Sequence, residues 1–207
     1  MVYREQFEYS GEWYGDSYVE EWLPAINSSE DLLKNYHRQA KYFQRTQEWF
    51  TDVLIKGDVL ELGHNDGKTI WWLNNNTPAI TNIDCIDFNE SLKKLEGPLR
   101  ELIPTIRDVW YADCRNINKP DNSYDCITCL DFYEHLPNDV YQESISECFR
   151  LLKEGGLMCV YLGKGTGIHH PEHINVIPDE KVIGDMCAKG FAYEGSRGRD
   201  KMLLFTK

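Results

Sequence analysis

From residue 58 to residue 206, short apolar runs alternate with amphipathic segments, and this alternation constrains the fold more than any other feature. Strands buried on both faces read as near-continuous apolar runs, and amphipathic helices cover those faces. We expect strands at 58–62, 82–87, 107–112, 124–130, 156–162, 191–195 and 201–206, and helices at about 66–75, 89–103, 138–152 and 178–188. Only GSRGRD joins the last two strands, so the seventh strand is predicted to be reversed. The pattern predicts an α/β three-layer sandwich with a seven-stranded, mostly parallel sheet.

The residues before the first expected strand carry a different pattern. Ser28 and Ser29 are suited to cap a helix, and apolar positions recur at helical spacing over residues 30–55. We therefore expect one short and one long helix ahead of the sheet. The chain divides into an N-terminal helical segment, residues 1–57, and an α/β core, residues 58–207, within one structural domain overall.

The charge and the apolar content of the chain limit the classes of partner that we expect. The chain has 34 acidic and 22 basic residues, and its net charge of -12 disfavours binding to nucleic acid. The basic cluster Arg197, Arg199 and Lys201 is interpreted as a solvated hairpin because Glu194 and Asp200 lie beside it in sequence. No apolar run approaches the roughly 18 residues of a membrane span, and the N-terminus lacks the pattern of a signal peptide. We expect a cytoplasmic protein that does not bind a membrane.

The seven cysteines are interpreted as structural. Cys85, Cys126, Cys129 and Cys159 lie inside apolar runs, where a thiol behaves as a small hydrophobic group. Cys126 and Cys129 have CxxC spacing, but residues three apart on a strand point to opposite faces. No second pair completes a zinc site, so neither metal binding nor redox chemistry is expected of them.

The stretch VLELGHNDGKT, residues 59–69, reads as a buried strand that runs into a glycine-bracketed turn and then a helix. Ligands of open α/β sheets bind beyond the carboxyl ends of the strands, where this turn lies. Its spacing is GxxxG, from Gly63 to Gly67, rather than the GxGxxG of dinucleotide-binding turns. Asn65 tolerates the left-handed backbone better than most residues. Glu61 at the entrance would repel a pyrophosphate and attract an ammonium or a sulfonium.

Two further acidic residues follow the next two expected strands. Asp87 comes after the second strand, where an acid can accept hydrogen bonds from ribose hydroxyls. Asp113 comes after the third strand, where it could accept a hydrogen bond from an adenine amine. A ligand with an ammonium, a ribose and an adenine but no phosphate satisfies Glu61, Asp87 and Asp113 together. S-adenosylmethionine is such a ligand.

The stretches VLELGHNDG, IDCIDFNES, YADCRNI, YDCITCLDFYEHL and RLLKEGGLMCVYL resemble the successive motifs of class I S-adenosylmethionine-dependent methyltransferases. The resemblance spans about residues 58–207 and implies a Rossmann-like fold, methyltransferase activity and S-adenosylmethionine as cofactor. It implies these cofactor-binding residues: Glu61, Gly63, His64, Asn65 and Gly67 at the methionine and ribose part, Asp87 at the ribose diol, Phe88 beside adenine, Asp113 with Cys114 at the adenine amine, and Leu130 at the methionine end. The departure from the family pattern is Asn65, which replaces the usual middle glycine.

The candidate catalytic residues follow the fourth and fifth expected strands. An acceptor hydroxyl needs a base, and Asp131 and His135 follow the fourth strand, whereas His169, His170 and His173 follow the fifth. We predict O-methylation of a small-molecule or sugar hydroxyl by one of the histidines, helped by Asp131. The absence of an NPPY-like tetrapeptide argues against a nucleobase amine as acceptor. The alternatives are a non-catalytic protein that binds S-adenosylmethionine or its product, an N-methyltransferase of a small amine, and a nicotinamide dehydrogenase.

Metal dependence is not favoured by the sequence. Some O-methyltransferases of this fold carry an Asp after strand four, which Asp131 resembles, and an Asp-Asn pair after strand five, where this chain has Leu162-Gly163-Lys164. The histidines and Glu172 are donor types that suit divalent ions, but no metal site is predicted. Helices before the first strand commonly cover the acceptor pocket in this family, so residues 1–57 are predicted to form a lid. The sequence leaves open whether the protein is a monomer or a homodimer.

Overall fold

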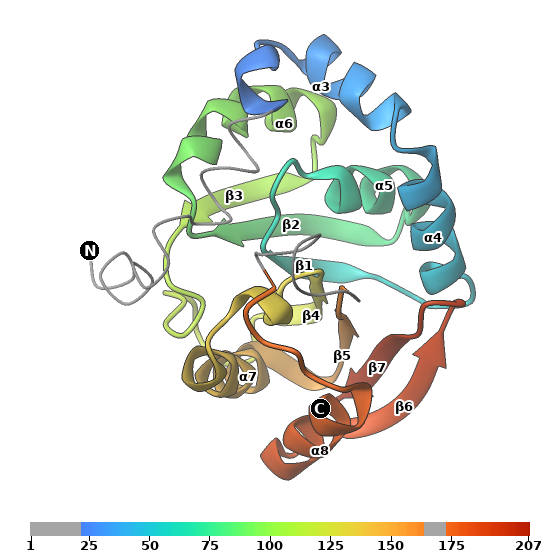
Figure 1. The fold of residues 1–207 in the computed structure, drawn as a ribbon, viewed down its shortest axis with the longest axis vertical. Helices are drawn as coiled ribbons and strands as arrows, with labels where there is room; N and C mark the ends of the chain where they lie inside the picture. Colours follow the sequence, from blue (N-terminus) through green and yellow to red (C-terminus); the bar gives the residue numbers. More distant parts are fainter. Residues whose placement is uncertain (1–21, 164–172) are drawn as a thin grey trace.

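The computed structural model describes residues 22–163 and 173–207. Its centre is a seven-stranded sheet in the order β3-β2-β1-β4-β5-β7-β6 (Figure 1). The strands are β1 (Gly57–Leu62), β2 (Ile80–Asp87), β3 (Ile106–Tyr111), β4 (Tyr124–Leu130), β5 (Leu152–Tyr161), β6 (Ala192–Arg197) and β7 (Met202–Thr206). Strands β1 to β5 pair in parallel, and β7 is antiparallel to both β5 and β6. The predicted mostly parallel Rossmann-like sheet with a reversed seventh strand is confirmed.

Helices flank this sheet (Figure 1). They are the 3-10 helices η1 (Leu23–Ala25), η2 (Glu90–Leu95) and η3 (Tyr133–His135), and the α-helices α3 (Ser29–His37), α4 (Ala40–Phe50), α5 (Lys68–Asn76), α6 (Glu96–Leu102), α7 (Asn138–Leu151) and α8 (Asp179–Lys189). One hydrophobic cluster contains residues of α3 to α6, and the other contains residues of α7 and α8. The neighbouring β1 residues Val59 and Leu60 belong to different clusters, because successive strand side chains point to opposite faces. The sheet is therefore buried on both sides.

The expected long N-terminal helix is two helices, so that prediction was wrong. Ser28 caps α3 as expected, since its Oγ accepts a hydrogen bond from the Asp31 N–H at 3.2 Å. The helix ends at His37, and α4 begins at Ala40. The break allows Gln39 Nε2 to donate to Asp66 Oδ2 at 3.0 Å, which ties the N-terminal helices to the turn after β1.

Among the residues that the structure describes, no disulfide joins the cysteines, and all of them except Cys187 are buried, in agreement with their structural interpretation. Cys126 and Cys159 lie on the adjacent strands β4 and β5. A hydrogen bond with Cys159 and burial raise the pKa of Cys126 well above its ordinary value, so this thiol stays protonated. Within residues 22–163 and 173–207, no helix has the length and apolar character needed to cross a membrane.

Candidate active site

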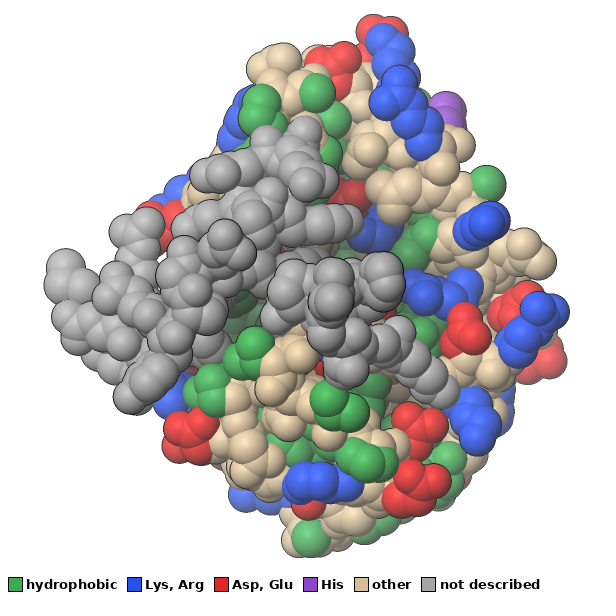
Figure 2. Space-filling view, viewed as in Figure 1, with side chains coloured by type: hydrophobic (Ala, Val, Ile, Leu, Met, Phe, Trp, Pro, Cys, Tyr) green, Lys and Arg blue, Asp and Glu red, His purple; other side chains and the backbone are tan. Residues whose placement is uncertain are grey.

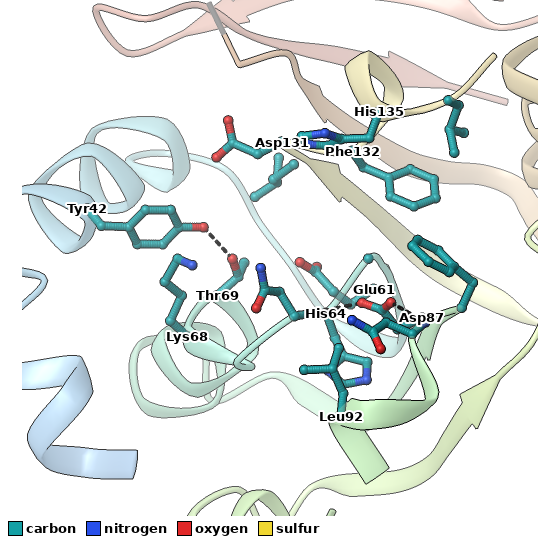
Figure 3. A pocket seen from close by; sticks show the side chains of 16 residues that line it. Tyr42, Glu61, His64, Lys68, Thr69, Asp87, Leu92, Asp131, Phe132 and His135 are labelled. Carbon is teal, nitrogen blue, oxygen red and sulfur yellow. Dashed lines mark hydrogen bonds between the residues drawn. The ribbon is translucent and has the colours of Figure 1, made fainter. Parts of the chain in front are cut away.

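A cavity lies beyond the carboxyl ends of β1, β2 and β4 (Figure 3). The chain leaves β1 toward β2 on one side, whereas β4 lies on the other side, so the strand order reverses here. Open α/β sheets bind their ligands at such a point. The cavity is lined by Tyr42, Glu61, Gly63, His64, Asn65, Lys68, Thr69, Asp87, Phe88, Asn89, Leu92, Leu130, Asp131, Phe132, His135 and Leu136.

The turn after β1 has the backbone that its glycines and asparagine predict. Gly63, Asn65 and Gly67 have φ values of +72°, +46° and +77°, all in the left-handed region. The expectation that Asn65 tolerates this conformation is confirmed, and the turn keeps its shape without a middle glycine. A Cβ at Gly63 would lie 2.5 Å from the Phe132 ring, so this position also requires a glycine for space.

Gly67 allows close packing of the turn and does not line the cavity. It precedes α5 and is not among the lining residues. A Cβ at this position would lie 2.3 Å from Leu99 Cδ2 and 3.3 Å from the Tyr36 hydroxyl oxygen. Gly67 therefore lets the turn approach α6 and α3 closely, a reason that the linear spacing does not reveal.

Glu61 is a buried carboxylate in the cavity wall, with 2% of its surface exposed. The Thr128 hydroxyl donates a hydrogen bond to it from the neighbouring strand β4. Burial raises the pKa of Glu61 to about 8, although Thr128 and the Lys68 ammonium both lower it. A bound cation would stabilise the ionised form of this side chain.

Asp87 is held by backbone donors at the end of β2. Its Oδ2 accepts a hydrogen bond from the Asn65 N–H at 3.1 Å, and its Oδ1 accepts one from the Asn89 N–H at 3.0 Å. Each carboxylate oxygen can accept a second hydrogen bond, so two hydroxyls of a ligand can also be bound. The adjacent Phe88 lines the same cavity, and its place beside adenine stays a prediction.

Buried polar atoms without partners lie in the same wall. Neither ring nitrogen of His64 has a hydrogen-bond partner among the described residues, and Asn65 Oδ1 has none either. Burial lowers the pKa of His64, so its ring is neutral. An unsatisfied buried polar group costs about 1–3 kcal/mol. A polar ligand would satisfy these atoms, and the donor set fits a cofactor with an ammonium and a ribose.

Asp113 and Cys114 do not line the cavity. Arg115 binds the Asp113 carboxylate through Nη2 at 2.7 Å, and its backbone N–H donates to Asp113 Oδ1 at 2.8 Å. Cys114 is buried in the hydrophobic cluster that contains residues of α7 and α8. The adenine-binding role of these two residues stays a prediction.

Asp131 lies at the end of β4 in the left-handed region, with φ of +51°. Arg45 Nη2 donates to its Oδ2 at 3.1 Å, and the guanidinium lies 5.1, 4.7 and 4.9 Å from the ring centroids of Tyr42, Trp49 and Tyr161. Burial raises the pKa of Asp131, whereas Arg45 lowers it, and burial dominates. No pattern in the sequence links Arg45 to Asp131, because only folding brings α4 to the end of β4.

Glu134, His135 and His173 converge beside Asp131. One donor atom of each lies within 4.8 Å of the others, and the two imidazole rings are 4.9 Å apart at 79°. Burial and the nearby Asp131 raise the pKa of Glu134 to about 8. The structure thus brings two predicted histidines together with Glu134. The predicted His169 and His170, with Glu172, lie outside the described residues.

Comparisons with known proteins agree with this geometry. Residues 59–156 match the methyltransferase domain family. No curated protein sequence matches the chain. Similar solved structures include a SAM-dependent methyltransferase from Archaeoglobus fulgidus, at 19% identity and a TM-score of 0.58, covering 86% of this chain and 75% of that one.

Two other similar structures are longer than the part that aligns. An O-methyltransferase family protein from Burkholderia thailandensis has 13% identity and a TM-score of 0.64, and the match covers 86% of this chain and 59% of that one. The cyclase SpnF has 19% identity and a TM-score of 0.60, and the match covers 74% of this chain and 57% of that one. This chain therefore spans less than two thirds of either protein, and these identities establish the fold alone.

The strand order, the cavity at its reversal and the turn after β1 define a Rossmann-like methyltransferase domain. Residues 59–156 match the methyltransferase domain family, and this match supports a class I methyltransferase with S-adenosylmethionine as its cofactor.

Proposed function

We propose that this protein transfers the methyl group of S-adenosylmethionine to a hydroxyl of a small molecule or sugar, with Asp131 or His135 as the base. One observation carries the proposal: Asp131 and His135 line the same cavity as Glu61 and Asp87. A group that accepts a proton is therefore available beside the residues suited to the cofactor.

The chain's own residues fit the parts of the cofactor. S-adenosylmethionine supplies a reactive methyl group on a positively charged sulfur. Glu61 would bind the ammonium of the methionine part, and Asp87 would accept hydrogen bonds from the ribose diol. The same two carboxylates would repel the pyrophosphate of a nicotinamide cofactor, which disfavours the dehydrogenase alternative.

A hydroxyl acceptor explains the groups on the other side of the cavity. Asp131 and His135 lie across it from His64 and Leu92 (Figure 3). Asp131 or His135 would take the proton of the acceptor hydroxyl. S-adenosylmethionine, when bound, would supply the methyl group to the acceptor oxygen and leave as the neutral sulfide. Residues that align the acceptor oxygen with the methyl group make the displacement effectively unimolecular.

An open depression beside the cavity carries charges of both signs. It is lined by Lys41, Arg45, Glu48, Arg199 and Asp200, and it shares Tyr42 with the cavity. Acidic and basic side chains are interspersed over the described part of this face (Figure 2), which agrees with a small acceptor rather than a long nucleic acid. The structural relatives include both an O-methyltransferase family protein and a cyclase, so the shared fold does not determine the acceptor.

The test combines cofactor binding with a screen for methyl transfer. Calorimetry measures the affinity for S-adenosylmethionine and S-adenosylhomocysteine, and mass spectrometry measures the gain of one methyl group by sugars, phenols and amines. We expect transfer to hydroxyls, with a loss of at least tenfold in rate for Asp131→Asn or His135→Ala, since positioned bases contribute about 10²–10⁴-fold. His37→Ala, on an exposed part of α3, is the matched control. Transfer to amines alone, or full rates in both variants, would reject the proposal.

A further inference from the structure

We propose that Glu134, His135 and His173 bind one divalent transition-metal ion, which holds the acceptor hydroxyl at the edge of the cofactor cavity. The site differs from the sequence-based expectation that no metal is bound. Metal binding itself stands on the geometry of these three residues, whereas the role given to the ion rests on the proposed O-methylation.

Two segments that are distant in sequence form the site. Glu134 and His135 are the last two residues of η3, and His173 follows β5 after the segment 164–172. Their donor atoms lie within 4.8 Å of one another. An ion about 2.0–2.2 Å from nitrogen and oxygen ligands holds such donors roughly 3–4 Å apart. Small side-chain movements would therefore complete the coordination.

Glu134 provides the second, independent observation. This carboxylate is 2% exposed, and its Oε1 accepts a hydrogen bond from the Gly163 N–H. Its Oε2 is buried and has no hydrogen-bond partner among the described residues. A buried carboxylate oxygen is normally paired or coordinates a metal. The free lone pairs of Oε2 are therefore available to a cation.

Two backbone N–H groups, one before and one after the segment 164–172, both bind Glu134. The Gly163 N–H donates to the Glu134 side chain, and the Asn175 N–H donates to the Glu134 backbone oxygen at 3.0 Å. A Cβ at Gly163 would lie 2.3 Å from Glu134 Oε1, 2.9 Å from His173 Cε1 and 3.0 Å from Asp131 Oδ1. Glu134, His173 and Asp131 thus surround Gly163, and only a glycine leaves room for them at this position.

The donor set selects the class of ion. Two imidazoles and one carboxylate suit Mn²⁺, Fe²⁺, Co²⁺, Ni²⁺ or Zn²⁺, whereas Mg²⁺ and Ca²⁺ prefer oxygen ligands alone. Three protein ligands leave positions open for an acceptor oxygen. A hydroxyl bound there loses its proton more readily, because the positive charge stabilises the alkoxide.

If the metal is bound, only one of the two candidate bases, Asp131 and His135, is available to accept the proton. His135 is used as a ligand, so Asp131 takes the proton from the bound hydroxyl. The acceptor oxygen then forms its bond to the methyl carbon, and the sulfur leaves with the electron pair of the broken bond. Asp131 is suited to this role because Arg45 binds only its Oδ2, while its Oδ1 faces Gly163 and Glu134.

The experiment begins with metal binding alone. The full chain is treated with EDTA, desalted and titrated by calorimetry with Zn²⁺, Mn²⁺ and Mg²⁺ separately. We expect one equivalent of Zn²⁺ or Mn²⁺ to bind at least 100-fold more tightly than Mg²⁺, with a loss of at least tenfold in Glu134→Gln and in His173→Ala. His37→Ala and Cys187→Ser, which alter exposed potential metal ligands, are the matched controls.

Separate measurements distinguish the two proposals. Binding of S-adenosylmethionine is measured in EDTA, and methyl transfer is measured with and without added metal. Equal metal affinity in wild type, Glu134→Gln and His173→Ala would reject the metal site. Methyl transfer at the full rate in EDTA would reject its role while leaving the proposed O-methylation intact. Metal binding without any methyl transfer to a hydroxyl would instead reject the O-methylation.

Discussion

At the scale of single residues, the cavity depends on carboxylates held away from water. Glu61 is buried in the wall and has a pKa raised to about 8 by desolvation. Asp87 is buried as well, but two backbone N–H groups bind its oxygens. A bound cationic cofactor would stabilise the ionised form of Glu61, which burial by itself disfavours.

We expect Glu61 to make the free protein less stable as the pH rises. The folded-state pKa of about 8 lies above the ordinary value of 4.5. The contribution of the protonated side chain is complete below pH 4.5 and is lost as the pH rises toward 8. In urea denaturation from pH 5 to pH 9, the free energy of unfolding of Glu61→Gln should rise relative to that of the wild type, by about 1.4 kcal/mol for each pH unit below the folded-state pKa. Glu154→Gln, at an exposed carboxyl, is the control, and parallel pH curves for wild type and Glu61→Gln would contradict this assignment.

Replacement of Asp87 should weaken the cofactor without unfolding the protein. Asp87→Asn keeps the size of the side chain but loses a charge-assisted acceptor, which is worth about 1.5–3 kcal/mol. S-adenosylhomocysteine should bind roughly 10- to 100-fold more weakly in calorimetry. Asp139→Asn changes an exposed acid at the start of α7 and should bind normally. An unchanged affinity in Asp87→Asn would remove this residue from the cofactor site.

At the scale of elements, the junction between α3 and α4 supports the turn after β1. Gln39 Nε2 and Asn35 Nδ2 both donate to Asp66 Oδ2, and the buried Tyr36 hydroxyl donates to the Asp66 backbone oxygen at 2.5 Å. One residue of the turn thus receives three hydrogen bonds from the N-terminal helices. The break between the two helices therefore lies where they contact the turn after β1.

Removal of the Tyr36 hydroxyl should affect both stability and cofactor binding. Tyr36→Phe leaves the Asp66 carbonyl without this donor, at a cost of about 1–3 kcal/mol in the free energy of unfolding. The affinity for S-adenosylmethionine should fall as well, because the turn from Gly63 to Gly67 is less well held. Tyr193→Phe, at a partly exposed ring on β6, is the matched control. If Tyr36→Phe matches the control in both measurements, the hydroxyl does not support the turn.

A substitution at Gly163, just after β5, gives a separate prediction for methyl transfer. Gly163→Ala places a Cβ less than 3 Å from Glu134 and His173, so these side chains must shift. We expect methyl transfer to fall at least tenfold while S-adenosylhomocysteine still binds, since Gly163 does not line the cofactor cavity. Gly184→Ala, on α8 with no atom within 4 Å of the added Cβ, should be active. Normal activity in Gly163→Ala would mean that the arrangement around Glu134 is not needed for the reaction.

At the scale of the whole molecule, one sheet separates two hydrophobic clusters. Trp49 lies in the cluster with residues of α3 to α6, whereas Trp110 packs against the cluster with residues of α7 and α8. Every central strand contributes side chains to both clusters. Unfolding of one cluster would therefore disrupt the strands on which the other cluster depends. The N-terminal helices contribute to the first cluster, and we expect them to unfold together with the core.

Thermal unfolding should therefore be a single transition. Tryptophan fluorescence and far-ultraviolet circular dichroism should give the same Tm, because one cooperative unit contains both clusters. S-adenosylmethionine at 100 times its Kd should add about 2.7 kcal/mol and raise the Tm by roughly 5–11 °C. Two separated transitions would show that residues 1–57 and the core fold independently. The same measurement on Asp139→Asn, which leaves the cavity untouched, should give the wild-type shift.

The sequence by itself determined the sheet and the carboxylates at the cofactor end of the cavity. Apolar runs and helical spacing are local signals, and the position of Glu61 or Asp87 after a strand follows from them directly. Only the tertiary structure decided that Gly67 packs against Leu99, that Arg45 binds Asp131, and that Glu134 meets His173. These contacts join segments far apart in the chain, and their geometry depends on how the helices and strand ends pack, which no local pattern encodes.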